Sequence, residues 1–501
     1  MLEIKDLTIE IETKKVIEKL SFIANMGDKI AIIGEEGNGK STLLKAIYDE
    51  TLLNYAKVSG SINKKDNSVG YLEQIIDEKY LNMEVFDYLF ESENAYYEKI
   101  DSFYNLLNEL HIDNYILNKH IRILSGGEKV KIQLLKILLR EPDILLLDEP
   151  TNDLDIETLV WLEEFINSYG GPIIFVSHDE YLLSKTANVI LHLELIRKKS
   201  VARNTVVRCN YDTYVEKRLR SLTKQEQVSR KENAVYKKQK QKLAQVMDKV
   251  HHQLNTISRG NPHGAKMLKR KMKTLKVQEK RLDEKELTEL PDIEEVINIF
   301  FEDVNIPRKK VILDIMIPVL KVEDKVLSNN ISLKVIGNEH IAIIGNNGCG
   351  KTTLVKEIVN ILKERVDLVF GYMSQNYEDI LDFNITPIEF LSKTYDKDEL
   401  SLIRSYMGNV NFTKEEMTCS IKELSGGSKA KLILLKLILD KCNVLILDEP
   451  TRNVSPISNP IVRNILSDFK GTIISISHDR KYIEEVCDKI YKLDNNGLFE
   501  L

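Results

Sequence analysis

The sequence predicts an α/β protein built from two copies of one domain, joined by a long α-helical hairpin. Short apolar runs and turn motifs in the first part of the chain recur in the same order about 300 residues later. Between Pro172 and Gly260 there is neither glycine nor proline, the strongest helix breakers. Apolar residues there repeat every seven positions, which indicates one apolar stripe along a helix. We expect domains at 1–200 and 301–501 and the hairpin linker at 201–300.

The composition suits an ordinary globular protein of two or three domains. The chain has 501 residues, of which 43% are hydrophobic. No apolar run reaches the ~18–20 residues that would span a bilayer, and the start of the chain lacks the basic end and apolar core of a signal peptide. The five cysteines are scattered, so they predict neither a disulfide framework nor a zinc site. We therefore expect a cytoplasmic protein.

A phosphate-binding loop follows the first buried strand, which we expect at 30–33. The motif G-x-x-x-x-G-K-[ST] is matched by Gly34-Glu35-Glu36-Gly37-Asn38-Gly39-Lys40-Ser41-Thr42. Its glycines let main-chain N–H groups close around phosphate oxygens, and the helix that follows presents its positive N-terminus. Lys40 adds a positive charge, and Ser41 can bind Mg²⁺.

Two further strands deliver reactive side chains at their carboxyl ends. The apolar run 144–147 leads into Asp148 and Glu149, a Mg²⁺ ligand followed by a carboxylate that could take a proton from attacking water. The apolar run 173–176 leads into a Ser-His-Asp sequence that contains His178.

The second half repeats this order of motifs. After the apolar run 341–344 its phosphate loop is Gly345-Asn346-Asn347-Gly348-Cys349-Gly350-Lys351-Thr352-Thr353. Its acidic pair is Asp448 and Glu449 and its histidine is His478, each 300 residues after its counterpart. The two halves are therefore one fold duplicated.

Each half also carries a Leu-Ser-Gly-Gly motif that opens an amphipathic helix just before the acidic strand. The copies are Leu124-Ser125-Gly126-Gly127-Glu128-Lys129 and Leu424-Ser425-Gly426-Gly427-Ser428-Lys429. With Gln74 and Gln375 in between, the chain resembles the ATP-binding-cassette ATPases over both halves. The fold class implied is α/β, with two ATP-binding-cassette (P-loop NTPase) domains joined by a long α-helical hairpin linker.

This resemblance implies an ATP hydrolase with two composite sites for ATP and Mg²⁺. In the family the Ser-Gly-Gly motif of one cassette reaches the ATP bound by the other, so we expect a monomer whose cassettes pair head to tail. The resemblance implies that the catalytic residues are Glu149, Glu449, His178 and His478. It implies that Mg²⁺ is bound by Ser41, Gln74, Asp148, Thr352, Gln375 and Asp448. The nucleotides are expected to be bound by both phosphate loops and by Ser125, Gly126, Gly127, Ser425, Gly426 and Gly427.

A narrower resemblance comes from Leu147-Asp148-Glu149-Pro150-Thr151-Asn152-Asp153-Leu154-Asp155, which is similar to the ABC-F translation factors. These are tandem cassettes without membrane domains, joined by a long helical linker that enters the tRNA exit site of the ribosome and points toward the peptidyl transferase centre. Residues 211–290 contain 21 Lys/Arg and 10 Asp/Glu, which gives this segment a net charge of +11, whereas the whole chain has a net charge of −6. A basic hairpin suits RNA phosphate, and a helix over 211–254 would be about 65 Å long.

The second half departs from the general ABC-F pattern. Its acidic motif continues as Arg452-Asn453-Val454-Ser455-Pro456. This variant resembles the antibiotic-resistance branch, which protects ribosomes from lincosamides, streptogramin A compounds and pleuromutilins. The partners implied are the 70S ribosome with its 23S rRNA and P-site tRNA, contacted at a tip near 251–266 that includes Ile257, Arg259 and Pro262. Because Ser455 and Pro456 cannot supply the carboxylate of Asp155, we expect the two sites to hydrolyse ATP unequally.

Other functions stay open from the sequence. Some sugar importers use tandem cassettes of this length, so the chain could be the energising ATPase subunit of a membrane importer, although a basic hairpin has no use there. A DNA-repair ATPase would show zinc cysteines or a longer coiled coil. The charge of the hairpin could also be a solvated helix face. No aromatic side chain is expected beside adenine, near Ile11 or in 319–326, so GTP could replace ATP.

Overall fold

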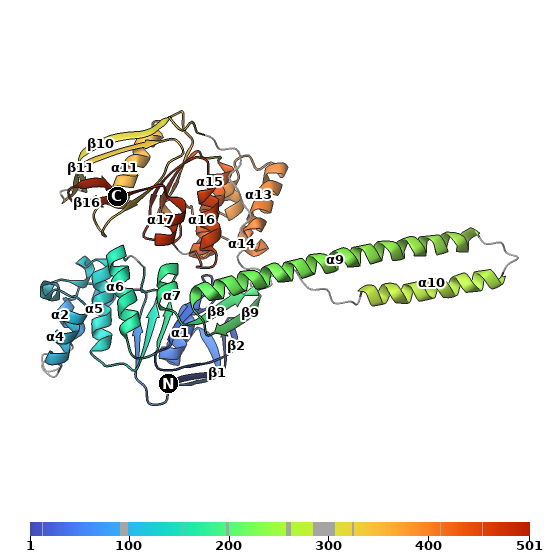
Figure 1. The fold of residues 1–501 in the computed structure, drawn as a ribbon, viewed down its shortest axis with the longest axis horizontal. Helices are drawn as coiled ribbons and strands as arrows, with labels where there is room; N and C mark the ends of the chain where they lie inside the picture. Colours follow the sequence, from blue (N-terminus) through green and yellow to red (C-terminus); the bar gives the residue numbers. More distant parts are fainter. Residues whose placement is uncertain are drawn as a thin grey trace. The chain divides into compact units, whose positions relative to one another are not determined.

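The computed structural model describes residues 1–501 except 13, 91–98, 153, 197–199, 257–261, 284–305, 323–324, 411 and 453. It divides into two units (Figure 1). One unit contains Met1–Asp212 together with Glu294–Leu501, and the other contains Thr213–Ile293. The first unit therefore holds both halves of the duplication.

The first half is organised around a mostly parallel six-stranded sheet in the order β5-β6-β7-β3-β8-β9. The four inner strands are buried along their whole length, which explains their nearly uninterrupted apolar sequences. Only β8 and β9 pair antiparallel. The strands are β3 (Lys29–Ile33), β5 (Val69–Leu72), β6 (Ile144–Asp148), β7 (Ile173–Val176), β8 (Val189–Leu195) and β9 (Val201–Val207).

A second, antiparallel sheet in the order β2-β1-β4 shares its core with helix α1 and the central sheet. Its strands are β1 (Leu2–Ile11), β2 (Lys14–Ala24) and β4 (Ala56–Asn63). The helices of this half are α1 (Lys40–Tyr48), α2 (Val85–Leu89), α4 (Ile100–Glu109), α5 (Gly126–Leu138), α6 (Ile156–Ser168) and α7 (Glu180–Thr186). Short 3-10 helices lie at η1 (Glu50–Leu52), η2 (Glu78–Tyr80), η3 (Asn114–Asn118) and η4 (Ile121–Ile123).

The six-stranded sheet of the second half has the same topology, in the order β13-β14-β15-β12-β16-β17, and lies beside a two-stranded β10-β11 sheet. Its strands are β10 (Val311–Val322), β11 (Lys325–Ile336), β12 (His340–Ile344), β13 (Phe370–Met373), β14 (Val444–Asp448), β15 (Thr472–Ile476), β16 (Lys489–Asp494) and β17 (Gly497–Glu500). Its helices are α11 (Lys351–Lys363), α12 (Pro387–Leu391), α13 (Lys397–Asn409), α14 (Lys414–Thr418), α15 (Gly426–Leu439), α16 (Asn459–Ser467), α17 (Arg480–Val486), η5 (Tyr377–Asp379) and η6 (Ile421–Glu423). The matching strand orders confirm the predicted duplication.

The linker is a pair of helices, α9 (Tyr211–Thr256) and α10 (Pro262–Asp283). Asp283 of α10 accepts hydrogen bonds from Tyr236 Oη at 2.7 Å and from Lys240 Nζ at 2.8 Å, so the two helices lie side by side there. With 46 residues, α9 extends for roughly 70 Å. Within the described part of the chain, no helix combines the length and apolar character that crossing a membrane requires.

Candidate nucleotide-binding sites

Both phosphate loops adopt a conformation that only glycine allows. Gly39 and Gly350, the residues before α1 and α11, have φ of 83° and 101°. A Cβ added at Gly34 would lie 2.2 Å from the Leu193 carbonyl oxygen, and one at Gly345 would lie 2.4 Å from that of Leu493. Glycine is therefore required at Gly34 and Gly345, where each loop passes close to strand β8 or β16.

The two loop lysines have the same surroundings. Lys40 Nζ donates to the carbonyl oxygens of Gly34 at 2.7 Å and Glu35 at 3.0 Å. Lys351 Nζ donates to those of Gly345 at 2.7 Å and Asn346 at 3.0 Å. In each half the helix that follows begins at the lysine itself. Each lysine charge thus lies inside its loop, beside the helix N-terminus.

Each hydroxyl expected to hold Mg²⁺ contacts the aspartate at the end of the acidic strand of its own half. Ser41 Oγ donates to Asp148 Oδ1 at 2.9 Å, and Thr352 hydrogen-bonds Asp448. Burial raises the pKa of Asp148 and of Asp448. Asp448 Oδ2 is buried and has no hydrogen-bond partner among the described residues, which leaves an oxygen for a cation. Gln375 lines a cavity together with Thr352 and Asp448. Hydroxyl, carboxylate and amide oxygens are the donor set that Mg²⁺ prefers, so these residues fit the ion.

Both predicted catalytic glutamates sit in the left-handed backbone region, with φ of 49° at Glu149 and 55° at Glu449. This conformation is strained for a residue with a side chain, and strained residues gather at functional sites. Glu149 accepts hydrogen bonds from Gln74 at 2.9 Å and Asn152 at 2.7 Å. His178 Nε2 lies 3.4 Å from Glu149 Oε1. The predicted residues of the first site are therefore brought together.

The electrostatics of the two glutamates differ. Burial would raise the pKa of Glu149, but the His178 ring, the Lys40 charge and the Asn152 amide together lower it to about 2. Burial and the neighbouring Asp448 charge raise the pKa of Glu449 to about 8. His478 Nε2 is farther away, 3.9 Å from Glu449 Oε1. At neutral pH Glu149 is therefore ionised, whereas Glu449 is largely protonated.

The second site is a cavity of about 450 Å³ lined by residues of both halves. Lys351 and Thr352 of the second phosphate loop line it together with Gly126 and His178 of the first half. Burial and the Lys351 charge lower the pKa of His478 to about 4, while the charge of Asp155 acts in the opposite direction. The Asp155 carboxylate is therefore within electrostatic range of this site.

The first site is closed by direct contacts between the halves. The Gly427 amide donates to Glu36 Oε2 at 3.0 Å, and Lys431 Nζ lies 2.8 Å from Glu35 Oε1. Glu35 and Glu36 are variable positions of the phosphate loop, and the second loop has asparagines there. Sequence reasoning missed these contacts with Lys431, although two acids in a phosphate-binding loop were a visible signal.

The Ser-Gly-Gly serines cap the helices they open. Ser125 Oγ accepts a hydrogen bond from the Glu128 amide at 3.3 Å, and Ser425 Oγ accepts one from the Ser428 amide at 3.2 Å. Each N-cap satisfies one main-chain amide in the first turn of α5 or α15. The N-terminus of each helix also carries a partial positive charge.

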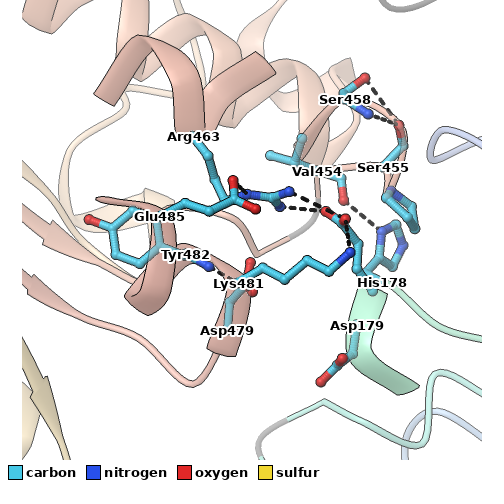
Figure 2. A network of polar contacts seen from close by, with 12 residues as sticks. His178, Asp179, Val454, Ser455, Ser458, Arg463, Asp479, Lys481, Tyr482 and Glu485 are labelled. Carbon is cyan, nitrogen blue, oxygen red and sulfur yellow. Dashed lines mark hydrogen bonds and ion pairs between the residues drawn. The ribbon is translucent and has the colours of Figure 1, made fainter. Parts of the chain in front are cut away.

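The loop after the second acidic strand contacts His178 of the first half (Figure 2). His178 Nδ1 donates to the Val454 carbonyl oxygen at 2.8 Å. Ser455 and Ser458 hydrogen-bond each other at 3.1 Å, and Tyr211 Oη donates to the Pro456 carbonyl oxygen at 2.9 Å. The sequence shows that this loop lacks the carboxylate that Asp155 supplies in the first half, but it gives no signal for these main-chain contacts.

Of the three residues expected at the linker tip, Ile257 and Arg259 lie outside the described residues. Pro262 is the first residue of α10.

Two phosphate loops that each face the Ser-Gly-Gly helix of the opposite half are the arrangement of a tandem nucleotide-hydrolysing cassette protein. A family model described as ABC transporter matches residues 17–152 and 328–452, and the chain therefore belongs to this ATP-binding-cassette family. ATP hydrolysis is the general activity of these domains, and they bind ATP typically with Mg²⁺.

The relatives place the chain among the tandem cassettes of the ABC-F type. "Ribosome protection protein VmlR" of Bacillus subtilis (strain 168) is 31% identical over 98% of this chain and 86% of its own length. "ATP-binding protein Uup" of Buchnera aphidicola subsp. Acyrthosiphon pisum (strain APS) is 29% identical over 99% of this chain and 81% of its own length. The fold is similar to that of an archaeal ribosome recycling factor, aABCE1, solved with the ribosomal stalk protein aP1. That match has a TM-score of 0.60 and 17% identity over 99% of this chain and 90% of that one.

Proposed function

We propose that the chain binds the 70S ribosome in an ATP-bound closed state and protects the peptidyl transferase centre from antibiotics. Cassettes at 1–200 and 301–501 act as the motor, and the linker at 201–300 enters the tRNA exit site. There it contacts 23S rRNA and P-site tRNA. The protein acts in the cytoplasm as a monomer.

The observation that carries this proposal is the long basic helix pair of the linker. The helices α9 and α10 belong to the segment 211–290, which holds a net charge of +11. Exposed lysines along a helix suit RNA phosphate, because neutralising phosphates releases counterions. The relative VmlR is named a ribosome protection protein, which supports the same proposal.

The linker tip is where we propose that the chain acts on the drug site. A hairpin narrows to a few residues at its end, so those residues meet whatever lies deepest in the RNA. In this chain they are 251–266, with Ile257, Arg259 and Pro262 facing the ribosome.

The cassettes supply the switch by binding and then hydrolysing ATP. Lys40 and Lys351 hold phosphate, while the N-termini of α5 and α15 reach the nucleotide bound by the opposite half. Closure fixes the ribosome-binding state, because a ligand shifts an equilibrium by its differential affinity for the two states. Glu149 and Glu449 orient and polarise the attacking water, and hydrolysis releases the protein.

Mg²⁺ would neutralise charge on the transferring phosphoryl group. Ser41, Gln74 and Asp148 would hold it at the first site, as would Thr352, Gln375 and Asp448 at the second.

Drug susceptibility with and without expression tests the antibiotic part of the proposal. We expect expression to raise the inhibitory concentration of a lincosamide, a streptogramin A compound or a pleuromutilin. Replacing residues 250–266 by a short neutral turn removes the protection while leaving ATP hydrolysis intact. Equal susceptibility with and without expression, for all three drug classes, would contradict it.

A further inference from the structure

Among the ion pairs between the halves of the first unit, two join equivalent helices. Arg463 of α16 meets Glu180, the first residue of α7, with Nη1 to Oε1 at 2.5 Å and Nη2 to Oε2 at 3.3 Å. Arg480, the first residue of α17, meets Glu163 of α6. Both pairs therefore link the long helix of one half to the start of a short helix in the other.

The two ion pairs are one contact made twice. Positions 163 and 463 are 300 residues apart, as are 180 and 480, and this is the offset of the duplicated motifs. The charges, however, are not duplicated. The first half has glutamate at both positions, and the second half has arginine at both.

These charges are removed from water and depend on each other. Arg463 is 2% exposed and Glu180 is 4% exposed. Arg463 Nε also pairs with Glu485 at 2.7 Å (Figure 2). Lys481 Nζ lies 3.2 Å from Glu180. An arginine cannot lose its charge, and a buried charge without a partner is strongly destabilising.

The second pair is also shielded from water. The side chains of Arg480 and Glu163 are 16% and 12% exposed. Arg480 lies 3.7 Å from Asp179 as well, and its guanidinium stands over the Tyr181 ring. In this pair too, the second half supplies the positively charged arginine and the first half supplies the negatively charged carboxylates.

We propose that Glu163, Glu180, Arg463 and Arg480 form a charge code that makes the two halves pair with each other and prevents each from pairing with a second copy of itself. If two first halves met in this geometry, Glu163 would face Glu180 twice. Two second halves would set Arg463 against Arg480. Pairing of unlike halves gains two ion pairs, whereas pairing of like halves brings like charges together.

The full-length chain offers a charge-reversal test. R463E/R480E makes all four positions acidic, and E163R/E180R makes all four basic. We expect each double variant to lose at least about tenfold in ATP hydrolysis, because both composite sites need the halves to pair. E157R/E164R reverses two exposed charges of α6 and serves as the matched control, with activity close to that of the unaltered chain.

Restoring opposite charges distinguishes a pairing code from simple misfolding. The fourfold variant E163R/E180R/R463E/R480E again has unlike halves, and we expect its activity to return to within about threefold of the unaltered chain. Mixing the two double variants should also restore hydrolysis, in a complex of twice the single-chain mass.

Two results would overturn the code: double variants as active as the unaltered chain, or a fourfold variant as inactive as the doubles. This test contains no ribosomes, so its outcome is independent of the proposed function.

Discussion

His178 of the first half donates a hydrogen bond from Nδ1 to the Val454 carbonyl oxygen of the second half, at 2.8 Å. The other nitrogen of the same ring, Nε2, lies 3.4 Å from the carboxylate of Glu149. His478 differs, because its Nδ1 is buried without a hydrogen-bond partner among the described residues. The first catalytic carboxylate is thus connected through one imidazole ring to the opposite half.

This difference predicts unequal effects of removing the two histidines. His178→Ala removes both the contact with Glu149 and the hydrogen bond to Val454, so we expect steady-state ATP hydrolysis to fall about tenfold. His478→Ala, the matched control, should cost less, because His478 lacks the bond to the other half. A larger loss from His478→Ala would show that the bond to Val454 does not matter.

The two glutamates should also contribute unequally at pH 7. Glu149 is ionised and positioned by Gln74 and Asn152, whereas the raised pKa of Glu449 leaves it mostly neutral. Phosphoryl transfer depends mainly on positioning and charge, so we expect Glu149→Gln to lower turnover more than Glu449→Gln. Single-turnover measurements on each variant test this. Equal losses would contradict the asymmetry.

The activity that remains in Glu149→Gln should rise with pH. A group with a pKa of about 8 is mostly protonated at pH 7 and mostly ionised at pH 9, so the carboxylate form of Glu449 increases about tenfold over this range. In Glu449→Gln the remaining Glu149 has a pKa of about 2 and is ionised throughout. Its activity should therefore show no such rise. A flat profile in both variants would argue against a protonated Glu449.

Tyr211 supports the loop that Val454 belongs to. Tyr211 is 1% exposed, and its hydroxyl donates to the Pro456 carbonyl oxygen at 2.9 Å. We expect Tyr211→Phe to lower the free energy of unfolding by about 1–2 kcal/mol, because a buried hydrogen bond is lost. In Tyr236→Phe, the control, the lost bond to Asp283 is exposed and the effect should be smaller. The thermal midpoints of both variants, compared with the unaltered chain, decide between these outcomes.

Much of the fold was predictable because its signals are local. An apolar run followed by a phosphate-loop sequence predicts a strand, a turn and a helix without reference to the rest of the chain. The same holds for the linker, where a helix predicted over 211–254 corresponds to α9 (Tyr211–Thr256). Duplication then predicted the second half from the first.

Contacts between the halves were not predictable in the same way. The bond from His178 to Val454 ends on a main-chain oxygen, which no side-chain pattern announces. The exchange of charge at positions 163/463 and 180/480 is visible once the halves are aligned. The sequence does not predict that Glu163 pairs with Arg480, because this contact depends on how the two folded halves pack head to tail.

The central claim, ATP-dependent ribosome binding through the linker, is tested most directly by co-sedimentation of the E149Q/E449Q variant with 70S ribosomes in ATP. We predict that this variant accumulates on ribosomes with ATP and not without it. Adding K237Q/K242Q/K273Q, three exposed linker lysines, should weaken binding about tenfold or more. The control K65Q/K363Q/K397Q removes three exposed lysines outside the linker and should bind normally. Failure of E149Q/E449Q to accumulate, or equal weakening by both lysine sets, would contradict the account.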